Sequence, residues 1–174
     1  MQRAWVIMAA GLLSSSTLCA AQAQPGPSRE HEYLKQLVGT WDATVKSLTG
    51  ESKGTMVYRL ELGGLWLVGN YQGDLGGRPF TGIGLNAYDP ASKKYVNVWV
   101  DSMSTTPMVM AGDVDPATGI MAMTGEGRGM DGRSAGMKSV LKMEGKDAIQ
   151  FTVYGVGPDG KETERIAIRY KRRR

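Results

Sequence analysis

The sequence predicts an all-β protein: an antiparallel up-and-down barrel of about ten strands, preceded by one short N-terminal helix. Short segments of alternating apolar and polar residues follow one another, with a turn signal about every eight to twelve residues. The connections are too short for crossovers, so neighbouring strands must pair antiparallel. Glycines within the strands indicate the bends that closing a small barrel requires. The alternative reading of these glycines is a close approach of the backbone to a ligand.

Residues 1–23 have the features of a secretory signal peptide. Arg3 supplies a positive charge, residues 5–13 form an apolar run, and Ala21-Gln22-Ala23 is a small-x-small cleavage site. The run is too short to be a spanning helix. We therefore expect cleavage after Ala23, a periplasmic or secreted protein, and no stable membrane anchor afterwards. The alternative is an uncleaved N-terminal anchor. Residues 24–174 then form a single domain.

Cysteine usage and charge exclude several functions. Cys19 is the only cysteine and lies within the signal peptide, so the mature chain has no thiol for disulfides, zinc sites or nucleophilic catalysis. The formal net charge is +4, but residues 171–174 are all basic. Without this tail and Arg3 the domain is close to neutral, and we expect no nucleic-acid partner.

A short helix is expected at the start of the domain. It follows a Pro/Gly-containing linker at 24–28, with Ser28 as N-cap and Glu30 in the first turn, where the helix dipole favours acids. Apolar residues recur at helical spacing over 33–38. Gly39 ends the helix as a C′ residue would.

The expected strands follow without a break that would indicate a second domain. Gly63-Gly64 predicts a tight hairpin, and 89–92 and 115–119 predict turns with proline at the second position. The expected strand ranges are 40–48, 55–62, 65–72, 80–88, 95–103, 108–114, 120–125, 137–143, 149–156 and 162–170.

The start of the first strand resembles the corresponding part of lipocalin-like barrels. Gly39-Thr40-Trp41 follows the helix and matches their Gly-x-Trp motif. The resemblance implies that Trp41 closes one end of the barrel and that an arginine of the last strand, Arg169 or Arg172, packs over it. Such stacking is physically sound, because a planar guanidinium can cover an indole while bonding nearby carbonyls.

A further resemblance covers nearly the whole mature chain. The motifs that carry it are His31-Glu32-Tyr33-Leu34, 37–41, Tyr88-Asp89, Lys94-Tyr95-Val96, 99–103 and 157–162. They are similar to the bacterial family of unknown function 1579 (DUF1579), which is associated with calycin-type barrels. The resemblance supports a calycin/lipocalin-like fold and implies no particular activity.

The strand expected at 95–103 has the most informative pair of faces. Trp99, Asp101 and Met103 share one face, and valines dominate the other. If the first face points inward, it forms a pocket wall with an aromatic platform and a polar handle. In the alternative, the valines form a dry core and Asp101 bonds loop amides at a strand end. The candidate ligand-binding residues are Trp99, Asp101, Met103, Met108, Met110 and Tyr71.

We therefore expect an exported protein that binds a small apolar or amphipathic molecule. Met108 and Met110, like Met121 and Met123, are two residues apart, so a Cu(I)-binding protein is an alternative, because thioethers are soft ligands. Methionine also fills irregular cores and adaptable pockets. His31 is the only histidine, and no nucleophile–base constellation is evident. We predict no catalytic residue, metal site or cofactor, and an enzyme with a cavity carboxylate is the weakest alternative.

Overall fold

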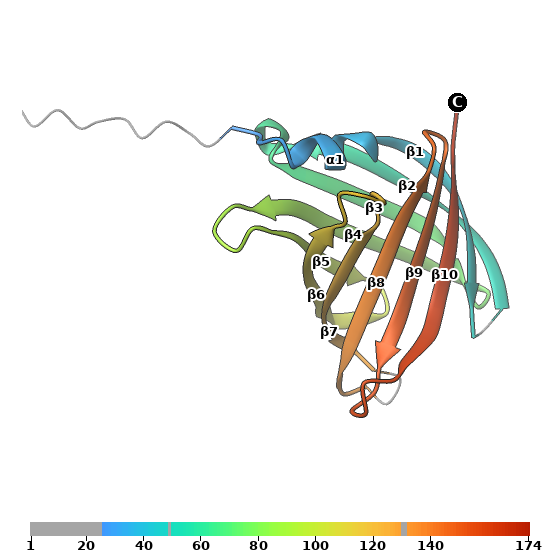
Figure 1. Cartoon of the computed structure of the whole chain (residues 1–174). Helices are drawn as coiled ribbons and strands as arrows, with labels where there is room; N and C mark the ends of the chain where they lie inside the picture. The colour runs from blue at the N-terminus through green and yellow to red at the C-terminus, as the bar shows by residue number, and fades with distance from the viewer. Residues whose placement is uncertain (1–25, 49, 130–131) are drawn as a thin grey trace, which may run out of the picture.

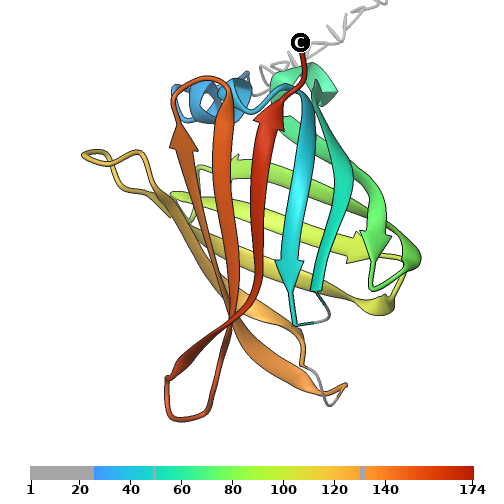
Figure 2. The same cartoon turned by 90° about the vertical axis from the view of Figure 1, so that its right-hand side faces the viewer.

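The computed structural model describes residues 26–48, 50–129 and 132–174 and shows ten antiparallel strands in a closed barrel. An α-helix lies across one end of this barrel (Figures 1 and 2). The signal-peptide prediction falls on residues outside this description. The elements are α1 (His31–Gln36), β1 (Gly39–Ser47), β2 (Gly50–Glu61), the short 3-10 helix η1 (Leu62–Gly64), β3 (Trp66–Leu75), β4 (Arg78–Asp89), β5 (Lys94–Asp101), β6 (Ser104–Val114), β7 (Met121–Arg128), β8 (Ser134–Glu144), β9 (Ala148–Val156) and β10 (Glu162–Arg172).

Each strand pairs with the next along the chain, and β1 pairs with β10 to close the barrel. This up-and-down order confirms the predicted all-β fold. Within the described residues, no helix is both long and apolar enough to cross a membrane.

Several predicted boundaries were wrong. The sixth strand begins at Ser104, before Pro107, and the turn that precedes it contains Met103. Ser28 makes no side-chain cap: Glu30 is at the N-cap position, and the Ser28 hydroxyl bonds its carboxylate. Gly39 is the first residue of β1 and not a helix C′ residue. The helix ends earlier because Leu37 is at its C-cap.

The helix closes its end of the barrel with apolar side chains. Leu34 and Leu37 are 1% and 3% exposed, and both pack in a core that includes the fully buried Trp41. The Trp41 indole donates to the Leu37 carbonyl at 2.8 Å, which joins the helix to the first strand. We call this the helix end of the barrel, and the opposite end, where β3 ends at Leu75 and β5 ends at Asp101, the far end.

The last strand fastens the helix end. Arg172 lies opposite Trp41 in the β1–β10 pairing, and its guanidinium carbon is 4.0 Å from the indole centroid. Its nitrogens donate to the carbonyls of Val38, Gln36 and Lys146 at 2.6, 2.9 and 2.8 Å. The predicted partner of Trp41 is therefore Arg172. Arg169 does not take this role, because it points outward and pairs with Glu144 at 3.0 Å.

Gly39 is required at this junction for two reasons. Its φ of +133° lies in the region that favours glycine, and a Cβ there would lie 2.6 Å from an Arg172 guanidinium nitrogen. In the Gly-x-Trp motif, Trp41 thus provides the ring on which Arg172 stacks, and Gly39 leaves space for the guanidinium of Arg172.

Candidate ligand-binding site

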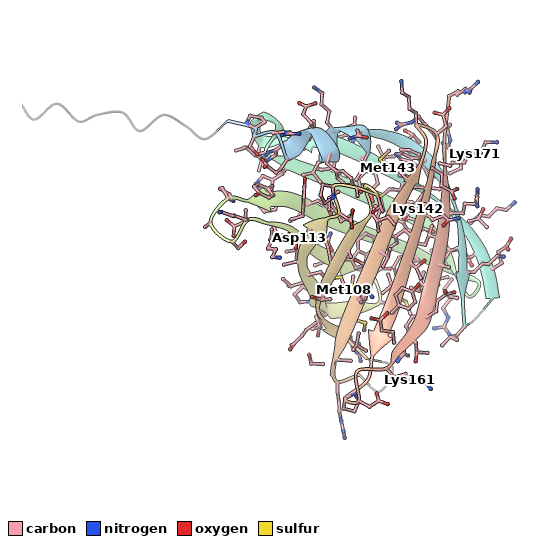
Figure 3. All side chains as sticks on the ribbon, in the orientation of Figure 1. Met108, Asp113, Lys142, Met143, Lys161 and Lys171 are labelled. Carbon is pink, nitrogen blue, oxygen red and sulfur yellow. The ribbon has the colours of Figure 1, made fainter. Side chains whose placement is uncertain are left out.

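A cavity of about 590 Å³ lies inside the barrel, and all ten strands and α1 contribute to its lining. It extends from Leu34 and Leu37 at the helix end to Leu75 and Ser104 at the far end. Met103 lines it there and is 53% exposed, so the cavity reaches solvent at the far end. Lys142, Lys161 and Lys171 instead point away from the barrel (Figure 3).

The face of β5 that carries Trp99 points inward. Asn97, Trp99 and Asp101 line the cavity, whereas Val100 is 43% exposed on the outer surface. The valine face therefore does not form the core. Of the two faces that the sequence left open, the one with an aromatic ring and polar side chains forms the pocket wall.

Trp99 and Asp101 form one hydrogen-bonded unit at the far end. The Trp99 indole donates to one Asp101 oxygen at 2.9 Å, and the Met103 backbone N–H donates to the other at 2.9 Å. Asp101 thus has both features that were considered alternatives, because it faces the cavity and also binds a turn amide. Its carboxylate fixes the indole and the turn, and the ring remains a fixed platform in the wall.

Glycines on the neighbouring strand make room for this ring. A Cβ at Gly82 would overlap the Trp99 indole, and one at Gly84 would lie 3.3 Å from it. Gly69 does the same for Tyr58, where a Cβ would lie 2.5 Å from the ring. These glycines therefore leave space for large inward side chains to lie against the wall. This role differs from both roles expected from the sequence, which were bends in the barrel and a close approach of the backbone to a ligand.

Three tyrosines add polar groups to the apolar wall. Tyr58, Tyr71 and Tyr170 line the cavity from β2, β3 and β10. Burial raises the pKa of Tyr58 to about 12. Burial, with smaller effects of Tyr58 and Tyr71, raises the pKa of Tyr170 well above 10. The Tyr71 hydroxyl is buried without a hydrogen-bond partner among the described residues. It lies against Gly54 and Gly73, so the neutral hydroxyls that can bond a polar group of a ligand are those of Tyr58 and Tyr170.

An amide pair lies nearer the helix end. The Asn97 amide donates to the Asn86 oxygen at 2.9 Å, and the Asn86 amide donates to the Leu67 carbonyl at 3.1 Å. Both side chains line the cavity. Because the Asn97 oxygen is the acceptor that this chain of bonds does not use, it can accept a hydrogen bond from a ligand.

Methionines make up much of the remaining wall. Met108, which the sequence proposed, lines the cavity, but Met110 is 2% exposed in the packed core and is not among the lining residues. The structure thus places the first methionine pair in two different surroundings, and Cu(I) coordination stays a prediction. The lining methionines are Met56, Met103, Met108, Met121, Met123 and Met137.

Gly127 lies beside two of these methionines, Met108 and Met137. A Cβ at Gly127 would lie 3.1 Å from the Met108 Cγ and 3.3 Å from the Met137 Cγ. Flexible side chains beside a residue without a Cβ can repack around differently shaped ligands. This part of the wall is therefore adaptable, in contrast to the fixed Trp99 platform.

Arg165 is a cavity residue that the sequence did not reveal. Strand alternation places it opposite to the inward Ile166, but the β9–β10 register shifts between Glu164 and Ile166, and Arg165 also lines the cavity. A Cβ at Gly155 would lie 2.6 Å from its Nε. The sequence contains no pattern that marks this bulge. Its one trace is Gly155, which alternation places on the same face of β9 as the lining residues Phe151 and Val153.

A metal centre finds no support among the acidic and histidine side chains. Within the described part of the chain, no group of three or more His, Cys, Asp or Glu residues could hold a metal ion. His31 is buried at the helix end, where its Nδ1 accepts from the Ser28 backbone N–H at 3.0 Å. Its position is that of a helix-packing residue and is remote from the far end.

Comparison with models of protein families shows to which family the chain belongs. Residues 26–172 match the model of a family described as "Protein of unknown function (DUF1579)". The chain belongs to the DUF1579 family. A search of curated proteins finds no match for this DUF1579 member.

Solved structures share the fold of this DUF1579 protein at low sequence identity. Rv2717c from M. tuberculosis is 14% identical with a TM-score of 0.61, and the match covers 84% of this chain and 99% of that one. The S-type phycobiliprotein lyase CPES from Guillardia theta is 9% identical with a TM-score of 0.58, covering 83% and 93%. These likenesses place the DUF1579 barrel among calycin-like barrels.

Proposed function

We propose that this protein binds a small, mainly apolar or amphipathic molecule inside its barrel. The observation that carries the proposal is the cavity of about 590 Å³, walled by apolar side chains with few polar groups. Ligand sites in proteins typically have about 300–1,000 Å³ and this composition. Apolar surface that a ligand removes from water here contributes roughly 25 cal/mol per Å² to binding.

The wall divides the tasks of binding between rigid and adaptable parts. Trp99, fixed by Asp101, offers a flat surface for the ligand, and the tyrosine hydroxyls and Asn97 fix the orientation of its polar groups. The methionines adjust to its shape. Such a wall favours a class of related molecules over a single one.

Native mass spectrometry of the protein purified from its own host tests this proposal. We expect a species heavier than the chain by a small organic molecule. Ser139→Phe, which fills the cavity from β8, should lose this species, and Lys142→Phe on the outer face of the same strand should keep it. Bare protein in repeated preparations would contradict the proposal, and a mass increase equal to copper would support the methionine alternative.

We also propose, from the sequence features of residues 1–23, that the protein is exported and cleaved after Ala23. The same spectra test this, because the mass of the chain should correspond to a start at Gln24. Recovery from the cytoplasm with an intact N-terminus would contradict it.

A further inference from the structure

A cationic group faces the cavity near its far end. Arg165 stands at the register shift of β10, which turns its side chain inward beside that of Ile166. The guanidinium lies against Gly155 of β9, where a Cβ would be 2.6 Å from Nε and 2.9 Å from Nη2. The bulge and the glycine together hold the cation against the wall, with Nε and Nη2 beside Gly155, and Arg165 is part of the cavity lining.

This cation has no counterion in the described structure. Its Nε is buried without an acceptor among the described residues, and none of the ion pairs formed by those residues includes Arg165. A buried N–H without a partner, on a charged group above all, is unfavourable. Nε itself is closed off against Gly155, but the Nη groups also have no acceptor among the described residues, so a ligand in the cavity can bond the guanidinium through them.

Three acidic side chains near the far end are bound elsewhere. Both Asp101 oxygens accept bonds, from Trp99 and from the Met103 amide. Asp74 accepts from the Gly77 amide at 2.8 Å. Glu162, at the start of the same strand, pairs with Lys138 at 2.8 Å. Each carboxylate is held by its own turn or strand, so Arg165 remains available.

We propose that Arg165 binds the carboxylate of an amphipathic acid whose apolar chain lies in the methionine-lined cavity. The inference rests on the proposed ligand-binding function and specifies its ligand class. A guanidinium presents two parallel N–H groups to a carboxylate, and this bidentate pair is stronger than a neutral hydrogen bond. The occupant thereby gives the Nη groups an acceptor, which the described residues do not provide.

The position of Arg165 sets the orientation of the ligand. It stands five residues before Tyr170, about 17 Å along an extended strand. The cavity continues from there to Leu34 and Leu37 under the helix. The acid group therefore lies toward the far end and the chain points toward the helix end.

Isothermal titration calorimetry with dodecanoate and dodecan-1-ol tests this inference, because the two probes share a chain and differ in charge. We expect the wild type to bind dodecanoate at least about ten-fold more tightly than the alcohol. Arg165→Met should abolish that preference and leave the affinity for the alcohol unchanged. Arg169→Met, an exposed arginine of the same strand, should bind as the wild type does.

Gly155→Ala provides a second variant that keeps the charge. Its Cβ displaces the guanidinium, so we expect a reduced preference for dodecanoate in a protein whose circular dichroism spectrum is unchanged. This variant decides the question if Arg165→Met fails to fold.

The outcomes separate the two proposals. Equal affinity of the wild type for acid and alcohol, or a preference that survives both variants, overturns the role of Arg165 while the binding function stands. Failure of both probes to bind the wild type counts against the binding function itself.

Discussion

At the scale of single residues, the barrel repeatedly sets a glycine beside a large inward side chain. Gly82 accommodates Trp99, Gly69 accommodates Tyr58, and Gly155 accommodates Arg165. Without a Cβ beneath it, a large group lies against the wall instead of projecting across the lumen. Densely packed interiors are the rule for proteins of this size, so these glycines help to explain why a cavity remains.

Gly82→Ala tests this at the most crowded position. The new methyl group overlaps the Trp99 indole, so we expect the ring to move, its bond to Asp101 to break, and the free energy of unfolding to fall by about 1–3 kcal/mol. Gly84→Ala is the matched control, because its Cβ would lie 3.3 Å from the same ring. Urea denaturation followed by tryptophan fluorescence measures both. Equal stability of the two variants would contradict this account.

At the scale of elements, one arginine of β10 joins the junction of α1 and β1 to the β8–β9 turn, which is distant from it in the sequence. Arg172 of β10 bonds the carbonyls of Gln36 and Val38 beside the helix and of Lys146 in the β8–β9 turn. It also stacks on Trp41 of β1. The helix end is therefore a single packed unit. If the helix detached, the cavity would open to solvent at this end, where Leu34 and Leu37 now cover it.

Replacing this arginine should weaken that unit more than any exposed ion pair would. Arg172→Met removes three hydrogen bonds and the cation–π contact, and we expect a loss of about 2–4 kcal/mol of stability. Arg169→Met, which breaks only an exposed pair with Glu144, should cost less than about 1 kcal/mol. Thermal denaturation by circular dichroism compares them. A similar loss in both variants would show that the stacked arginine has no special role.

At the scale of the whole molecule, the closed sheet encloses ionisable phenols in an apolar wall. Burial raises the pKa of Tyr58 to about 12 and that of Tyr170 well above its usual value of 10. Between pH 10 and 12 the unfolded chain releases phenolic protons that the folded protein keeps. Folding stability therefore falls as pH rises through this interval.

The contribution of one tyrosine to the alkaline loss of stability can be measured. For Tyr58 the shift corresponds to a fall on the order of 2 kcal/mol between pH 10 and 12. Tyr58→Phe has no phenolic proton at that site, so its stability should fall less over the same interval. Urea denaturation at several pH values, with the phenolate absorbance as a second signal, measures the difference. Parallel pH profiles for variant and wild type would contradict the assignment.

The structural features that depend on the period of apolar residues could be predicted from the sequence, whereas the inward position of a residue at a register shift could not. Alternation and turn residues gave the ten strands, and the face of Trp99 and Asp101 was identified as one of two possibilities. Arg165 was missed because a bulge reverses its side, and a bulge depends on pairing with β9 that sequence spacing does not encode. Met110 was assigned to the wall because alternation gives the face of a residue and not its depth.

The positions of the chain ends have a practical consequence. The Arg173 backbone N–H bonds the Thr40 carbonyl, and Pro27 lies close to Gly64, so both described ends are at the helix-covered side of the barrel (Figure 1). A fluorescent protein or a sensor surface attached at either end would stand on the side opposite to Met103. Immobilised molecules would present the open end of the cavity to the solution, which is the geometry that a binding assay on a surface requires.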